Sequence, residues 1–135
     1  MTELIVVQTD GQNVSDEIST LPPQIQERLL RLQQLQQTLQ SILGQKQQVE
    51  LETMEINQAL DELQKLADDA TIYKATGSLL IKAEKTKVTT DLNERKELLT
   101  TRSTVLSKQE ERLRGQVKDL QTKLQQELNP VSPPA

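Results

Sequence analysis

Leucine recurs every seven residues through the second half of this chain, and no other feature limits the possible folds as strongly. The repeat runs through Leu92, Leu99, Leu106, Leu113 and Leu120. Earlier in the chain, a second apolar set follows the alternating three- and four-residue steps of a heptad: Leu32, Leu35, Leu39, Ile42, Val49, Ile56, Leu60 and Leu63. Such spacing places one narrow apolar seam on each of two helices, as coiled-coil packing requires.

The composition indicates a thin core rather than a compact globular one. Hydrophobic residues make up 34% of the 135 residues, whereas globular domains contain about 45–50% apolar residues. The chain has no Phe and no Trp, and Tyr73 is its one aromatic residue. Because aromatic side chains supply the largest buried areas in most cores, this core must consist of Leu, Ile and Val.

Residue types that support catalysis are largely missing. The chain contains no Cys and no His, which excludes disulfides, thiolate zinc sites and nucleophiles that depend on histidine. We expect the acidic pairs at Asp61-Glu62, Asp68-Asp69 and Glu110-Glu111 on exposed helix faces or at helix ends, where no cleft encloses them. The glycines are isolated, so no phosphate-binding loop is present. We expect neither an enzyme nor a requirement for a metal or cofactor.

Charge and hydropathy exclude two further kinds of partner. The net charge is −4 and the basic residues are dispersed, which disfavours nucleic acid. No apolar stretch approaches the roughly 18 residues of a membrane span. Leu4–Val7 follows Glu3 and is too short for a signal peptide. We expect a cytoplasmic protein that contacts neither nucleic acid nor membrane.

Proline and composition shifts divide the chain into five segments. We expect a mobile extension over 1–20, a coiled-coil helix over 21–67, a β-hairpin over 68–84, a second coiled-coil helix over 85–129 and a flexible tail over 130–135. A short docking strand at Leu4–Val7 is the alternative for part of the extension. Equal helix lengths and a short connection favour an antiparallel pair of helices. When the ends of the two antiparallel helices are matched, Ile25 faces Leu128, and we expect Lys46 to form an ion pair with Glu110 or Glu111.

The hairpin is the second informative element. With Ala75–Ser78 as the turn, Lys74 pairs with Leu79 and Ile72 pairs with Ile81. Both faces of the hairpin are then apolar. An isolated two-stranded hairpin is marginal in water and has open hydrogen-bonding edges. The sequence therefore predicts assembly with other copies or subunits through an intersubunit sheet, carried by Ile72, Tyr73, Gly77, Leu79, Leu80 and Ile81.

Three segments resemble the β-class subunits of prefoldin, a hexameric co-chaperone family. They are PPQIQERLLRLQQLQQTLQSILGQKQQVE at Pro22–Glu50, DDATIYKATGSLLIKAEK at Asp68–Lys85 and KQEERLRGQVKDLQTKL at Lys108–Leu124. The hairpin segment makes the resemblance to this family specific, because an ordinary coiled coil does not need such a segment between its helices. A single hairpin is typical of the β class, since α-class subunits carry two.

The resemblance implies an ATP-independent chaperone subunit. In the family, hairpins of two α-class and four β-class subunits form a double β-barrel, and the coiled-coil tips hold unfolded polypeptides before transfer to a group II chaperonin. The tip residues expected to bind clients in this chain are Leu21, Ile25, Leu29, Leu30, Leu32, Val117, Leu120, Leu124, Leu128 and Val131. Leu29 and Leu30 are adjacent and cannot both point into one seam, so apolar surface remains for weak, sequence-tolerant binding.

The alternative function is a passive coiled-coil scaffold without client binding. Such a scaffold dimerises through its seam and only separates other proteins. It has no need of the apolar hairpin residues Leu79, Leu80 and Ile81. Polar replacement of these residues distinguishes the two functions, because only the hairpin-built assembly depends on them.

Overall fold

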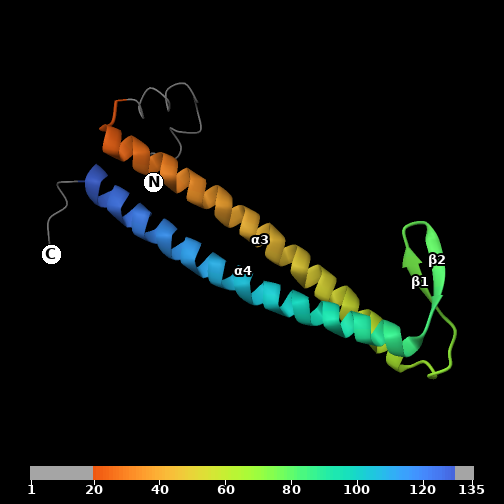
Figure 1. Cartoon of the computed structure of the whole chain (residues 1–135). Coiled ribbons are helices and arrows are strands. Elements are labelled where there is room, and N and C mark those ends of the chain that lie inside the picture. Colours follow the sequence, from red (N-terminus) through yellow and green to blue (C-terminus); the bar gives the residue numbers. More distant parts are fainter. Residues whose placement is uncertain (1–19, 130–135) are drawn as a thin grey trace. The chain divides into compact units, whose positions relative to one another are not determined.

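Over the residues that the structure describes, the fold consists of two long helices with one β-hairpin between them in sequence. The computed structural model describes residues 20–129. It contains helix α3 (Pro23–Gln64), strands β1 (Ile72–Thr76) and β2 (Leu79–Ala83), and helix α4 (Lys85–Leu128) (Figure 1). The mainly α fold class predicted from the heptads is confirmed.

Some expectations concern residues outside the described range. They are the N-terminal extension up to residue 19, with Leu4–Val7, and the tail over 130–135, with Val131. The described residues fall into two compact units. The terminal unit comprises residues 20–40 and 111–129, and the hairpin unit comprises residues 41–110.

Proline sets the start of α3. Pro23 is its first residue, a position where the missing N–H is not needed and the fixed φ already suits a helix. The Pro22 carbonyl accepts hydrogen bonds from the backbone N–H groups of Ile25 at 2.9 Å and Gln26 at 3.1 Å. The Gln26 side chain also donates to the Leu21 carbonyl at 2.7 Å, which fixes the chain entering the helix.

In the hairpin unit, most of the predicted heptad residues form a buried core, whereas Leu60 and Leu92 are half-buried. Ile42, Val49, Ile56 and Leu63 are buried on α3, and Leu99 and Leu106 are buried on α4. The Lys46 ammonium lies 2.6 Å from the Glu110 carboxylate, which confirms the predicted ion pair between the helices.

Polar residues at core-type positions of the seam reach polar partners on the opposite helix. Arg95 bonds to Glu52 at 3.0 Å, and Arg102 donates to the Gln45 side-chain oxygen at 2.9 Å. Long side chains keep their charged ends in water while their stems cover the seam. These residues therefore close the sides of a thin core without burying an unpaired charge.

The terminal unit has its own, smaller core. Ile25 and Leu35 of α3 and Leu124 of α4 are buried. An ion pair between Arg28 and Glu127 joins the two helices. Both the core and the ion pair agree with an antiparallel pairing of the first turns of α3 with the last turns of α4.

The register of the β-hairpin differs from the prediction. Thr76 pairs with Leu79, Lys74 with Ile81 and Ile72 with Ala83, so the loop has two residues rather than four. Gly77 has a φ of 60°, the left-handed value that a two-residue hairpin loop with Gly first requires. The predicted turn over Ala75–Ser78 was wrong because this tight turn extends each strand by two residues.

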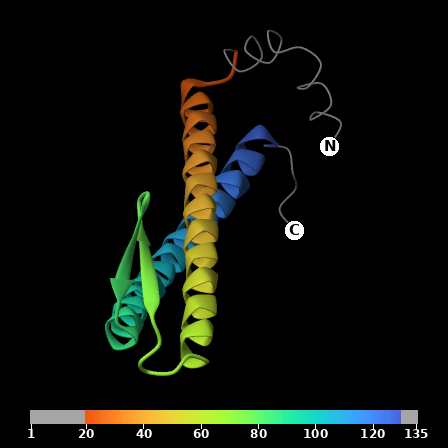
Figure 2. The same cartoon turned by 90° about the vertical axis from the view of Figure 1, so that its right-hand side faces the viewer.

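A register change of two residues keeps the side chains on their predicted faces, since strand side chains alternate with period two. Ile72, Leu79 and Ile81 share one face, and Tyr73 and Leu80 share the other. The sheet of the described residues has two strands. In Figures 1 and 2 the hairpin lies where α3 ends and α4 begins, with no further strand beside it.

Candidate functional site

The described residues carry neither a metal-binding cluster nor a membrane-spanning helix. Within residues 20–129, no group of three or more acidic, His or Cys side chains is placed to hold a metal ion. Over the same range, no helix combines the length and apolar character needed to cross a membrane.

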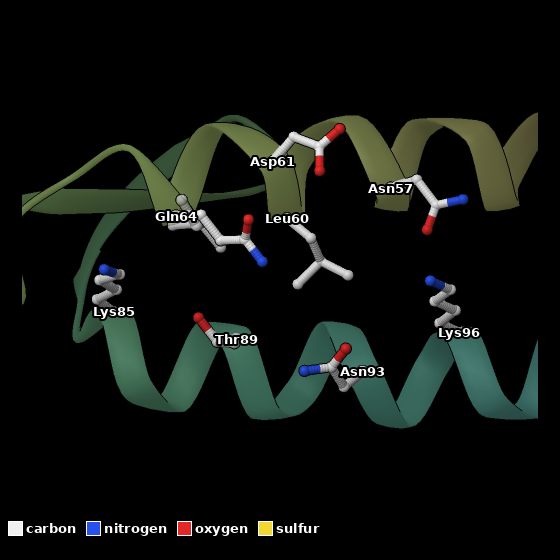
Figure 3. Close-up of a pocket in the computed structure, with 9 residues that line it drawn as sticks. Asn57, Leu60, Asp61, Gln64, Lys85, Thr89, Asn93 and Lys96 are labelled. Carbon is white, nitrogen blue, oxygen red and sulfur yellow. The ribbon is translucent and has the colours of Figure 1, made fainter.

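An open groove of about 540 Å³, lined by both polar and apolar side chains, lies between α3 and α4 in the hairpin unit (Figure 3). Asn57, Asp61 and Gln64 come from α3, and Lys85, Thr89, Asn93 and Lys96 come from α4. Lys85 is already held by the Leu66 carbonyl at 2.7 Å and by the Asp68 carboxylate at 3.2 Å. The Lys85 ammonium is therefore already paired within the hairpin unit.

The hairpin forms the first apolar surface. Its exposed fractions range from 50% at Ile81 to 73% at Leu80, with Tyr73 and Leu79 in between. Ile72 is half-buried. Burying one such side chain contributes about 1.5–3 kcal/mol. Two open strand edges and apolar residues on both faces give this hairpin the chemistry of an assembly surface.

The predicted tip residues divide into three groups in the terminal unit. Ile25 and Leu124 are buried in its core. Five are half-buried: Leu21, Leu29, Leu32, Val117 and Leu120. Leu30 and Leu128 are exposed, at 56% and 48%. Of the described tip residues, these last two offer the most apolar surface to another molecule.

Leu29 and Leu30 have the different environments that their adjacency requires. A step of one residue turns a helix by about 100°, so one seam cannot receive both side chains. Leu29 takes the seam side and is half-buried, and Leu30 remains exposed. The sequence indicated this conflict but not which of the two leucines would be exposed.

Further exposed apolar residues in the hairpin unit were missed. Leu51 and Met54 lie on α3, and Leu98 and Val105 lie on α4; all four are exposed. For the two residues on α4 the sequence did indicate exposure, because Leu98 directly precedes the seam residue Leu99 and Val105 directly precedes Leu106. A heptad seam accommodates one residue of each such pair, so the neighbour is left outside.

Comparison with known proteins gives a consistent family match. The family model described as "Prefoldin subunit" matches residues 26–130. A prefoldin subunit beta of Saccharolobus islandicus is 48% identical over 113 residues, covering 84% of this chain and 90% of the relative. One from Methanosarcina acetivorans is 46% identical over 112 residues, covering 83% and 96% respectively.

Solved structures agree with the sequence matches. The prefoldin beta subunit from Thermococcus strain KS-1 matches with a TM-score of 0.74 and 41% identity, covering 85% of this chain and 98% of that one. The beta2 subunit from the same strain has a TM-score of 0.61 at 23% identity and covers 67% and 97% respectively. The second match supports the fold alone.

Proposed function

The chain belongs to the prefoldin family, and from that membership we propose that it is an ATP-independent holdase subunit. It captures non-native polypeptides at the tip formed by the start of α3 and the end of α4. The family is one of chaperones rather than enzymes. Delivery of the captured polypeptide to a group II chaperonin is part of the same proposal.

The observation that carries the proposal is the exposure of Leu30 and Leu128 in the terminal unit. An exposed leucine beside half-buried ones, such as Leu29, provides apolar contact without an enclosed pocket. Such a surface binds apolar segments weakly and with little sequence preference. Several weak sites in one assembly then bind a single client through avidity.

Assembly through the hairpin supplies the several sites. We propose that hairpins of four such chains and two α-class subunits join edge to edge in an intersubunit β-barrel. The exposed faces of Leu79, Leu80 and Ile81 support this arrangement, because a closed barrel removes open edges and buries apolar faces.

The test measures light scattering as a chemically unfolded protein is diluted into buffer without nucleotide. The chaperone is this chain assembled with an α-class subunit. We expect the assembly to suppress aggregation and the double variant Leu30→Ser/Leu128→Ser to suppress it much less. Leu98→Ser is the matched control, since Leu98 is also an exposed helix leucine but lies in the hairpin unit.

If the control and the double variant lose aggregation suppression equally, the tips are not the binding site. Absence of suppression by every version, with the oligomer shown to be intact, would favour the passive scaffold. Chaperonin delivery is tested separately, by asking whether the same tip variants lose binding to a group II chaperonin in pull-down measurements.

A further inference from the structure

Two shallow grooves of the terminal unit share one residue, Arg31. The first, of about 510 Å³, runs along α3 and is lined by Gln24, Glu27, Arg28, Leu30, Arg31 and Gln34. The second, of about 230 Å³, lies between the helices and is lined by Arg31, Leu35, Gln116, Asp119, Leu120 and Lys123. Together they form a surface, which we call the Arg31 groove, whose linings carry the basic residues Arg28, Arg31 and Lys123 and the acidic residues Glu27 and Asp119 beside apolar side chains.

The residues before the described range carry a segment that suits this surface. Leu4–Val7 reads Leu-Ile-Val-Val, with Glu3 before it and Asp10 shortly after it. Four apolar residues next to acidic ones suit a surface on which the exposed Leu30 lies beside Arg31. The family model matches residues 26–130, so Leu4–Val7 lies outside the matched range.

The connection is long enough for Leu4–Val7 to reach the groove. Residues 8–20 supply thirteen residues, which span up to about 40 Å when extended. The lining residues Gln24 and Gln34 are ten positions apart on α3, or about 15 Å along the helix. A tether of this length produces a local concentration in the millimolar range, so a weak contact suffices for high occupancy.

The charges are complementary as well. Residues 1–19 carry Glu3, Asp10, Asp16 and Glu17 and no Lys or Arg. The described terminal unit has an excess of basic residues: Arg28, Arg31, Arg112, Arg114, Lys118 and Lys123 against Glu27, Glu111, Asp119 and Glu127. Arg28 is paired with Glu127, whereas Arg31 forms no ion pair with any of residues 20–129. Arg31 is thus available to an acidic segment beside Leu30.

We propose that Leu4–Val7 docks into the Arg31 groove of its own chain and competes there with non-native polypeptides. The segment acts as an internal substitute for a client and shields Leu30 until a client with larger apolar area displaces it. The competition rests on the proposed holdase function, but the docking itself does not.

A single fluorescent label tests the docking. Because the chain has no Cys, Gln8→Cys can be labelled with bimane before the chain is assembled with an α-class subunit. Acrylamide quenching then reports whether the label, next to Val7, is shielded. We expect quenching at least about twofold weaker than for a labelled peptide of residues 1–20, since a segment docked half of the time is shielded half of the time.

Groove variants identify where the label is shielded. Leu30→Ser and Arg31→Glu should each raise quenching toward the level of the peptide, and the control Leu98→Ser should leave it unchanged. Both groove residues are exposed, so far-UV circular dichroism should show unaltered helix content. Quenching equal to that of the peptide, or shielding insensitive to both groove variants, would overturn the proposal.

A mixing experiment distinguishes the chain's own groove from that of a neighbour. Labelled chains that carry Leu30→Ser are assembled with an excess of unlabelled wild-type chains. Docking within one chain predicts that the label stays accessible. Shielding restored by the wild-type chains would place the segment on a neighbouring subunit and contradict the proposal.

Client affinity tests the competition. Ile5→Asp/Val7→Asp removes the apolar character of the segment and leaves the groove intact. If Leu4–Val7 occupies the groove of the wild-type chain for between one half and nine tenths of the time, removing it frees the groove for a client. The variant assembly should then bind reduced, unfolded lysozyme about two- to tenfold more tightly than the wild-type assembly does. Unchanged affinity despite proven docking would overturn the competition. No lysozyme binding by any version would instead contradict the holdase function, and the bimane result would stand.

Discussion

Lys46 and Glu110 lie 64 positions apart in sequence, and their ammonium and carboxylate groups meet at 2.6 Å across α3 and α4. Lys46 occupies a core-type position of the heptad, where an apolar residue would normally lie. A charged residue at such a position specifies register at some cost in stability. The pair therefore selects one alignment of the two helices in the hairpin unit.

A double-mutant cycle on this ion pair measures that contribution. Lys46→Ala and Glu110→Ala should show a coupling energy of about 1 kcal/mol, because both side chains are partly shielded from water. The coupling should decrease as salt is raised. The exposed pair Lys65–Glu62, three residues apart on one turn, is the control and should give about 0.3 kcal/mol. Equal couplings for the two pairs would contradict a special role for Lys46.

The buried seam should dominate stability. Leu106 is 3% exposed and Leu98 is 73% exposed, although both lie on α4 in the hairpin unit. Leu106→Ala should lower the free energy of unfolding by about 2–3 kcal/mol through lost burial and a residual cavity. Leu98→Ala should change it by less than about 0.5 kcal/mol. Urea denaturation at one fixed protein concentration checks both values, and a similar loss for the two variants would show that Leu98 is buried in the assembly.

Three glycine substitutions should differ in sign. Gly44→Ala in α3 and Gly115→Ala in α4 should each raise stability by about 1 kcal/mol, since helix propensity favours Ala and an added Cβ meets nothing within 4 Å. Gly77 has the same free space, but its φ of 60° is unfavourable for a side chain. Gly77→Ala should therefore destabilise the hairpin by about 1 kcal/mol.

Thermal unfolding of the three glycine variants, each at the same concentration, checks this prediction. Stabilisation by Gly77→Ala would mean that the turn adopts another conformation. Destabilisation by Gly44→Ala or Gly115→Ala would indicate that a neighbouring subunit approaches the helix there.

Assembly should depend on the hairpin. Leu79→Ser/Leu80→Ser/Ile81→Ser removes three exposed apolar side chains and leaves the seam intact. Mixed with an α-class subunit, the triple variant should elute as small species in size-exclusion chromatography with light scattering. Leu98→Ser/Val105→Ser alters exposed apolar residues of α4 and should leave the large assembly unchanged. A triple variant that still forms the large species would contradict assembly through the hairpin.

The sequence alone determined the helices, the seam and an ion pair of Lys46 with Glu110 or Glu111, of which the structure selects Glu110. Heptad spacing depends only on helix geometry, so Ile42, Val49, Leu99 and Leu106 could be placed in the core without knowing the fold. Proline fixed the start of α3 for an equally local reason.

The tertiary structure decided the hairpin register and the division of the terminal leucines. Loops of two and four residues leave the same side chains on the same face, so only the backbone turn at Gly77 distinguishes them. Likewise, Ile25 and Leu124 are buried while Leu30 and Leu128 are exposed. Near a helix end, apolar side chains outnumber the positions that one seam can bury, and only the packing of α3 against α4 selects which of them face water.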